Sequence, residues 1–191
     1  MTTNPYSLGG EMNLRRTEIY IITGPPGVGK STIAGMVANR LDNSAFIEGD
    51  MIYHMVAGGF VSPWEDDGLY LELFWENVLD ITANFIQRNI SVVLEYIIFP
   101  EQLNMIANRF GKEGIKIKYI VLMAGEDTIL KRDNSRELDC RMGEKTLDML
   151  DQFRKLNIDK KYILDTSNLN EEDTLNIIMA ENRFELYIKL G

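Results

Sequence analysis

The sequence has almost no cysteine and no long apolar run, and both absences narrow the class of protein. Cys140 is the single cysteine among 191 residues, so an internal disulfide is excluded and a reducing compartment is favoured. No apolar run approaches the roughly 18 residues that cross a membrane, and residues 1–17 lack the apolar segment of a secretory signal. We expect a loose leader at 1–17 and one domain at 18–191, in the cytoplasm and without a membrane partner.

Positive charge is scarce as well, with 20 Lys and Arg residues against 29 Asp and Glu residues and a net charge of −9. The basic residues form no block along the chain, which argues against nucleic acid or an anionic membrane as the main partner. An anionic ligand must therefore be held by a few local cations, by backbone N–H groups or by a metal ion.

Strand-like apolar runs alternate with helix-like segments along the chain. This alternation predicts an α/β domain of three layers, in which helices cover both faces of a five-stranded parallel sheet. We expect strands at 18–23, 45–48, 91–97, 115–123 and 161–166. We expect helices after residue 30 and at 50–58, 68–88, 100–110, 126–133, 144–156 and from 171. Ser62–Glu65 (SPWE) has the form of a capping box and predicts a helical turn before the long helix.

A glycine-rich stretch between the first expected strand and helix matches a phosphate-binding loop. Residues 24–31 (GPPGVGKS) fit the pattern G-x-x-x-x-G-K-[ST]. Glycines allow successive N–H groups to face one anion, and the following helix adds its N-terminal dipole. The lysine should reach the β- and γ-phosphates of ATP, and Ser31 should place its hydroxyl on Mg²⁺. The predicted ATP-binding residues of the loop are Gly24, Pro25, Pro26, Gly27, Val28, Gly29, Lys30, Ser31 and Thr32.

The sequence lacks the signatures of other proteins with this loop. It contains no N-K-x-D motif for guanine and no L-S-G-G-Q signature of transporter subunits. Ring-forming ATPases are usually larger and carry extra helical parts. A small kinase remains, and the polar segment 134–143 suits a short lid.

Four stretches together resemble the adenylate-kinase-like group of P-loop kinases. They are GPPGVGKST at the loop, FIEGD (46–50), LEY (94–96) and LKRDNSR (130–136). The gluconate kinase, shikimate kinase and chloramphenicol phosphotransferase branches are closest in size, and residues 49–59 also resemble bacterial proteins classed as nucleotide or gluconate kinases. The resemblance covers about 18–180 and implies the strand order 2-3-1-4-5 with a short lid.

Two carboxylates follow expected strands, at the edge of an open α/β sheet that faces the ligand. Asp50 could accept the proton of an attacking hydroxyl or orient it; alternatively, it caps a helix that begins at Met51. Glu95 ends an apolar run, where a carboxylate is costly unless it is paired or near a metal. Relatives usually carry aspartate there, so Glu95 could reach metal-bound water or the acceptor, or be merely solvated. Both are predicted catalytic residues, and either could be the base.

Three arginines are candidates for the nucleotide. In the resembling group the first arginine of such a pair packs on adenine and the second belongs to a closing lid. This implies that Arg132 contacts adenine and that Arg136, as a catalytic residue, and Arg141 lie in the lid. A closing lid stabilises the transferred charge and excludes water. The alternative is that these arginines pair with nearby acidic side chains at the surface.

Further candidates are weaker. Relatives wrap the loop at 165–168 around the adenine edge, which implies a role for Asn168, although turn formation also explains it. His54 lies one helical turn after Asp50 and could touch the acceptor or simply pack. Five aromatic residues could line the acceptor pocket or belong to the core: Tyr53, Phe60, Trp64, Trp75 and Tyr96.

The stretch expected to build the acceptor site is poor in cations. Between Asp42 and Asn108 the only Lys or Arg is Arg88, whereas a phosphate-bearing acceptor needs arginines and a carboxylate needs at least one cation. We therefore predict an ATP- and Mg²⁺-dependent kinase for a small neutral acceptor. Gluconate- or shikimate-type and nucleoside or nucleotide kinases are alternatives, as is a nucleotide-binding regulator or slow NTPase. The same stretch is rich in acidic residues: Asp50, Glu65, Asp66, Asp67, Glu72, Glu76 and Glu95.

Overall fold

Five parallel strands form one sheet in the order β2-β3-β1-β4-β5 in the computed structural model. The structure describes residues 17–111, 114–135 and 141–187, so the predicted leader lies almost entirely outside the described residues. The observed order confirms the one implied by the resemblance. The strands are β1 (Glu18–Thr23), β2 (Ser44–Glu48), β3 (Ser91–Glu95), β4 (Lys116–Met123) and β5 (Ile163–Asp165).

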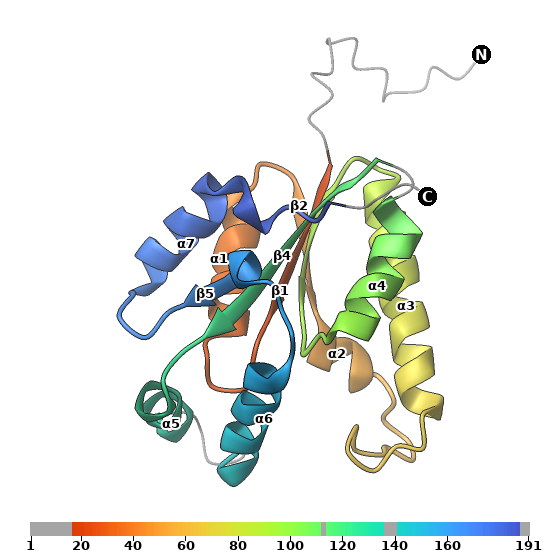
Figure 1. The fold of residues 1–191 in the computed structure, drawn as a ribbon. Helices are drawn as coiled ribbons and strands as arrows, with labels where there is room; N and C mark the ends of the chain where they lie inside the picture. Colours follow the sequence, from red (N-terminus) through yellow and green to blue (C-terminus); the bar gives the residue numbers. More distant parts are fainter. Residues whose placement is uncertain (1–16, 112–113, 136–140, 188–191) are drawn as a thin grey trace, which may run out of the picture.

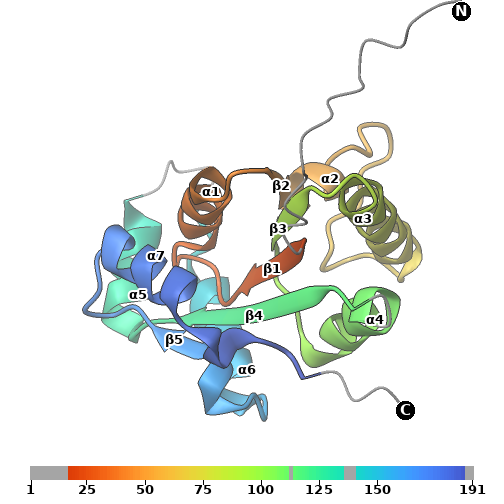
Figure 2. The ribbon, with the colours of Figure 1, turned by 90° about the horizontal axis from the view of Figure 1, so that it is seen from above.

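Helices cover both faces of this sheet, which confirms the three-layer α/β architecture (Figures 1 and 2). One face carries α1 (Lys30–Arg40) and α7 (Glu171–Ala180), and the other carries α3 (Leu69–Ile86) and α4 (Pro100–Phe110). The remaining helices are α2 (Gly49–Tyr53), α5 (Glu126–Asn134) and α6 (Glu144–Lys155), with single 3-10 turns η3 (Lys160–Tyr162) and η4 (Asn182–Phe184). Within the part of the chain that the structure describes, no helix has the length and apolar character needed to cross a bilayer.

The central strand β1 is buried on both faces. Ile19 and Ile21 pack into a core with α3, α4 and α6, whereas Tyr20 and Ile22 pack into a second core with α1 and α7. Side chains of a strand alternate between faces, so a strand inside a covered sheet needs apolar residues at nearly every position. The continuous apolar run that predicted this strand therefore reflects the two helical layers.

The short helix after β2 is a correction to the sequence analysis. It begins at Gly49 with Glu48 as its N-cap and ends at Tyr53, not at residue 58. The His54 N–H and its ring Nδ1 both contact the backbone carbonyl of Asp50, the ring at 2.7 Å, which closes the last turn. Asp50 consequently lies inside the first turn of α2 and does not cap it.

The predicted turn at Ser62–Glu65 is present, but it does not cap the long helix. The Ser62 carbonyl accepts the N–H groups of Glu65 and Asp66 at 2.8 and 3.0 Å, which makes a single turn. The cap of α3 comes instead from the Asp66 carboxylate, which accepts from the N–H groups of Tyr70 and Leu71 at 3.2 and 2.8 Å. Gly68, with φ +112°, separates the turn from the helix, so the predicted turn stands before α3 as a separate unit.

Candidate active site

The phosphate-binding loop connects β1 to α1 at the edge of the sheet where all five parallel strands end. Gly24 and Gly29 take left-handed φ angles of 139° and 100°, which other residues rarely adopt. A side chain on Gly24 would place its Cβ 2.2 Å from the carbonyl oxygen of Leu122. The loop therefore lies directly on the neighbouring strand β4, and glycine is required there.

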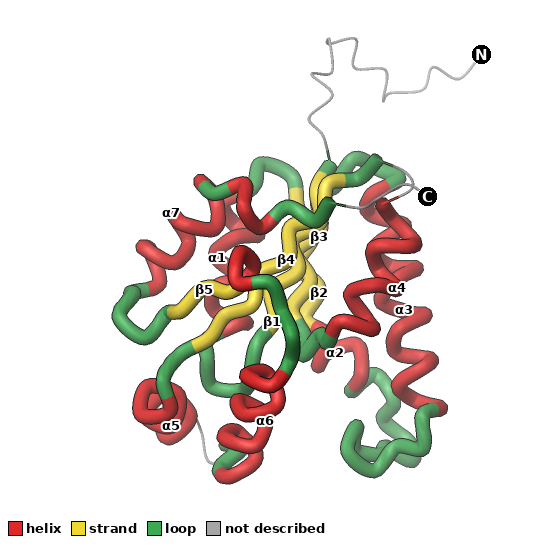
Figure 3. Tube along the Cα trace, viewed as in Figure 1, coloured by secondary structure: helices red, strands yellow, loops and turns green. Residues whose placement is uncertain are grey.

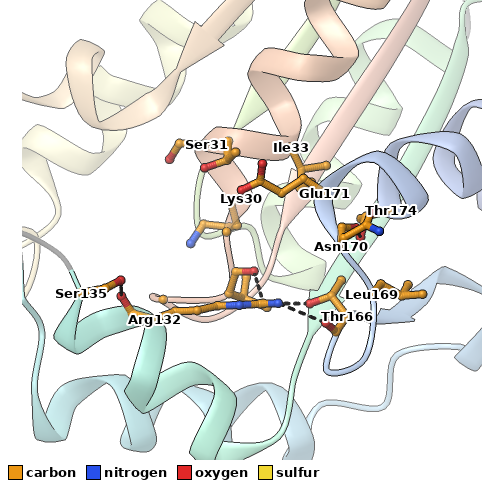
Figure 4. A pocket seen from close by; sticks show the side chains of 14 residues that line it. Lys30, Ser31, Ile33, Arg132, Ser135, Thr166, Leu169, Asn170, Glu171 and Thr174 are labelled. Atoms are coloured by element: carbon orange, nitrogen blue, oxygen red, sulfur yellow. Dashed lines mark hydrogen bonds between the residues drawn. The ribbon is translucent and has the colours of Figure 1, made fainter.

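The loop forms one wall of a cavity of about 300 Å³. The opposite walls come from α5 and from the connection between β5 and α7 (Figure 4). Its size and its position over the loop suit a nucleotide. The lining residues are Gly27, Val28, Gly29, Lys30, Ser31, Thr32, Ile33, Arg132, Ser135, Thr166, Leu169, Asn170, Glu171 and Thr174.

Glu95 meets the loop at the tip of β3, as the sequence predicted. β3 lies beside β1 with Glu95 opposite Ile22. The Ser31 hydroxyl donates to Glu95 Oε2 at 3.2 Å, and Lys30 Nζ lies 3.9 Å from Oε1. Glu95 is only 4% exposed, so the alternative of a merely solvated carboxylate is excluded.

The position of Glu95 changes its acidity. Burial raises the pKa of its carboxyl, and the nearby charges of Asp50 and Glu48 raise it further. Lys30 and the hydrogen bond from Ser31 act in the opposite direction. The ionised form of Glu95 thus depends on its contacts with the phosphate-binding loop.

Ser31 and Glu95 bring a hydroxyl and a carboxylate together beside the phosphate-binding loop. Mg²⁺ bound with a nucleotide takes only one or two protein oxygens, and phosphates and waters supply the rest. Among the described residues no group of three His, Cys, Asp or Glu side chains is arranged to hold a metal on its own. The donor set therefore fits a Mg²⁺ that arrives with a nucleotide, with Ser31 as a ligand.

Arg132 lines the cavity and is held firmly by its neighbours (Figure 4). One of its terminal nitrogens donates to the Val28 carbonyl and to the Thr166 hydroxyl, both at 3.0 Å. The other donates to the Thr166 carbonyl at 3.1 Å. Sequence reasoning missed Thr166, although it directly follows β5 in the loop that had been singled out.

The other predicted nucleotide residues are not gathered at this cavity. Arg136 lies outside the described residues, as does most of the expected lid. Arg141 is exposed and Asn168 is exposed, and neither lines the cavity. In the loop after β5 the cavity is lined by Thr166 and Leu169, and the first residues of α7 follow.

Asp50 lies at the start of α2, two residues after Glu48, which is paired with Glu95 in the sheet. It is exposed, and its charge raises the pKa of both Glu95 and Tyr96. The Tyr96 ring packs against Phe74 at 4.6 Å and against Gly49, where a Cβ would lie 2.5 Å from the ring. The structure thus brings together the two carboxylates that the sequence put forward as the base.

The aromatic side chains that were predicted to line the acceptor pocket fall into two groups, one buried in the core and one at the surface. Tyr53, Trp75 and Tyr96 pack among one another and Phe74, and His54 stacks on Phe60 at 5.0 Å between ring centres. Packing therefore accounts for Tyr53 and Trp75, which are buried, whereas His54 and Phe60 are exposed.

Residues 54–68 between α2 and α3, which we call the arm, lie at the same end of the sheet as α6 (Figure 3). Tyr53 holds the arm by donating to the Val61 carbonyl at 3.0 Å. Trp64 is 53% exposed, and Lys145 Nζ of α6 lies 6.0 Å from its ring centre. Of the predicted aromatic residues, Phe60 and Trp64 on the arm remain accessible to an acceptor.

Comparisons with solved structures give the same architecture. A sugar kinase from Janibacter sp. HTCC2649 superposes with a TM-score of 0.62 and 17% identity, over 84% of this chain and 91% of that one. The tunicamycin resistance protein of Deinococcus radiodurans gives 0.58 and 16%, over 86% and 94%. A gluconokinase from Sinorhizobium meliloti 1021 gives 0.59 and 15%, over 87% and 91%. The chain has a P-loop kinase fold. No family model matches the sequence, and no curated protein does.

Proposed function

We propose that this P-loop protein is a kinase that transfers the γ-phosphate of ATP, bound with Mg²⁺, to a hydroxyl of a small neutral acceptor. The carrying observation is the contact of Ser31 and Lys30 with the buried Glu95, whose strand partner Glu48 directly precedes the short helix that carries Asp50. This cluster joins a phosphate-binding loop to two carboxylates at the edge of the sheet. Such an arrangement suits transfer of a phosphoryl group better than binding alone.

The roles at the donor end follow from position. Lys30 and the loop N–H groups bind the β- and γ-phosphates, and Ser31 contributes its hydroxyl to Mg²⁺. The metal, when bound, neutralises charge that develops on the transferred group. Glu95 holds the Ser31 hydroxyl by accepting its proton in a hydrogen bond. Arg132 lines the same cavity and would contact the adenine ring of ATP.

The roles at the acceptor end divide between the two carboxylates. Glu95 accepts a hydrogen bond from Ser31 and lies close to Lys30, so its proposed role is to orient the residues that bind the phosphates and the metal. Asp50 is exposed on α2 beside it, so it is the better base for the acceptor hydroxyl. Arg136 and Arg141 remain predicted lid residues.

A neutral acceptor is favoured by what surrounds Asp50. Arg88, the only Lys or Arg between Asp42 and Asn108, donates to the Asn84 carbonyl at the C-terminal end of α3, far along the helix from the arm. Since this stretch supplies no cation near Asp50, the charge of a phosphate or carboxylate acceptor beside two carboxylates would have to be compensated from other elements, such as Lys145 of α6 near Trp64.

The test is a screen of the purified protein with ATP and Mg²⁺, in which ADP formation is followed. Nucleoside monophosphates, gluconate, shikimate and neutral hydroxyl compounds are compared, with Lys30→Ala as the control. We expect slow hydrolysis without acceptor and clear stimulation by a neutral hydroxyl compound. Strong phosphorylation of a monophosphate or a sugar acid would contradict the neutral acceptor. Hydrolysis that no acceptor stimulates would indicate a regulator or slow NTPase.

A further inference from the structure

We propose that Thr166 is a positioning residue that fixes the guanidinium of Arg132 as a platform for the base of the donor nucleotide. This inference rests on the proposed binding of ATP. Thr166 lies directly after β5, is 3% exposed, and lines the cavity together with Arg132.

The guanidinium is held from two directions in its own plane. Its donors reach the hydroxyl and the carbonyl of Thr166 on one side and the Val28 carbonyl of the phosphate-binding loop on the other (Figure 4). All N–H groups of a guanidinium lie in its plane. Three such bonds to two separate segments therefore fix both the position and the tilt of the flat group.

Thr166 is itself anchored to the neighbouring strand. Its hydroxyl donates to the carbonyl of Met123 at 3.2 Å, and its backbone N–H donates to the same carbonyl at 2.8 Å. A hydroxyl has one proton, so with that proton on Met123 the Thr166 oxygen must accept from Arg132. The direction of both hydrogen bonds is thereby determined. The end of β4 is linked through Thr166 and Arg132 to the phosphate-binding loop.

This geometry decides which part of Arg132 a ligand can use. Three of the hydrogen bonds of the guanidinium go to protein oxygens, so the group is poorly placed to bind phosphates with its edge. These hydrogen bonds do not use the flat faces of the guanidinium, and arginine faces stack well on planar rings. Leu169 and Ile33 add apolar surface to the same cavity. Loss of the Thr166 hydroxyl should make the Arg132 guanidinium more mobile. It should therefore weaken binding of the adenine ring but not binding of the phosphates.

The experiment compares two ligands that differ only in having a nucleoside. Binding of ATP and of inorganic triphosphate, each with Mg²⁺, is measured by calorimetry for the full chain and its variants. Thr166→Val removes the hydroxyl at nearly constant shape. We expect it to weaken ATP binding about five- to tenfold, as for loss of one well-formed hydrogen bond, and to change triphosphate binding less than about twofold. Thr166→Ser keeps the hydroxyl and should restore ATP binding.

Arg132→Ala and the double variant show whether Thr166 acts through the arginine. The double variant should bind ATP no more weakly than Arg132→Ala alone, because the two residues form one unit. Additive losses would overturn the inference. So would an equal loss for both ligands, which indicates a role in folding only, or an unchanged ATP-to-triphosphate ratio in Thr166→Val. A wild-type protein that binds neither ligand would overturn the proposed function together with this inference.

Discussion

Glu95 bears an ionisable group where the fold disfavours its charge. Burial raises its pKa, and Asp50 and Glu48 add to the effect, against Lys30 and Ser31. The folded state therefore holds a proton on Glu95 more tightly than the unfolded chain does. It follows that this residue lowers the free energy of unfolding as pH rises from the ordinary carboxyl pKa through the raised one.

Glu95→Gln should consequently be more stable than the wild type at neutral and alkaline pH, yet less active. We expect turnover to fall about 10- to 100-fold, because the support of Ser31 is altered. Urea unfolding at several pH values measures the stability difference, which should shrink as pH falls towards about 4.3. Glu76→Gln, at an exposed site on α3, is the control for the effect of the Glu-to-Gln change itself. A Glu95→Gln variant less stable than the wild type at neutral pH would contradict this reading.

Asp50 leads to a different prediction because it is exposed and is the proposed base for the acceptor hydroxyl. Asp50→Asn should lower kcat by about 10²- to 10⁴-fold, the usual contribution of a general base. Its dissociation constant for ATP should stay within about twofold, since Asp50 does not line the nucleotide cavity. Steady-state kinetics with the acceptor found in the screen, together with calorimetry, separate these effects. An unchanged kcat would assign the base to Glu95.

At the scale of elements, the phosphate-binding loop depends on one close approach of two backbones. Gly24 combines φ 139° with a Cβ position 2.2 Å from the Leu122 carbonyl oxygen. Gly35, inside α1, has open space around its Cβ position. The two glycines thus provide a matched pair for the same substitution.

Gly24→Ala should destabilise the protein by more than about 2 kcal/mol, from strain and from displacement of β4 or the loop. Gly35→Ala should instead be neutral or stabilise α1 by about 0.5–1 kcal/mol, because alanine loses less backbone entropy in a helix. Thermal and urea unfolding of both variants measure the difference. Equal effects at the two positions would show that the approach of the loop to β4 is looser than described.

The connection between α5 and α6 is closed by a buried carboxylate. Asp133 is 2% exposed and accepts from the N–H groups of Met142 and Gly143 at 3.3 and 3.0 Å. It also lies under the phosphate-binding loop, 3.6 Å from the Cβ position of Gly27. Asp133 therefore ties together both ends of the expected lid next to the phosphate-binding loop.

Asp133→Ala should lower the free energy of unfolding by about 1–3 kcal/mol, since it leaves two N–H groups without their acceptor. Asp148→Ala, at an exposed position on α6, should change it by less than about 0.5 kcal/mol. Urea unfolding of the two variants provides the comparison. Equal stabilities would show that solvent replaces the carboxylate without loss.

At the scale of the whole molecule, the chain carries a net charge of −9. If ATP binds as proposed, its negative charge must be compensated locally, at the phosphate-binding loop and by Mg²⁺. Mg²⁺ with ATP at a hundredfold excess over its Kd should stabilise the fold by about 2.7 kcal/mol. For a chain of this size each kcal/mol raises Tm by roughly 2–4 °C. Thermal unfolding with and without ligand measures the shift, and Lys30→Ala should abolish most of it. A full shift in Lys30→Ala would place the nucleotide elsewhere.

Much of the fold could be read from the sequence because its signals are local. The strand Glu18–Thr23 and the helix Pro100–Phe110 were predicted to the residue, since an apolar run and an N-terminal proline act within a few positions. The phosphate-binding loop is equally local. The contact of Glu95 with Ser31 could be anticipated because parallel strand ends meet at one edge of the sheet.

Tertiary structure alone decided the features that depend on residues far apart in the chain. Thr166 meets Arg132 across 34 positions, and no pattern in either segment announces the pair. The sequence determined a phosphate-binding loop within an α/β sheet, because backbone curvature and apolar periodicity are local properties. Which side chains complete the site was decided by packing, because hydrogen bonds between distant segments form only once the sheet has brought them together.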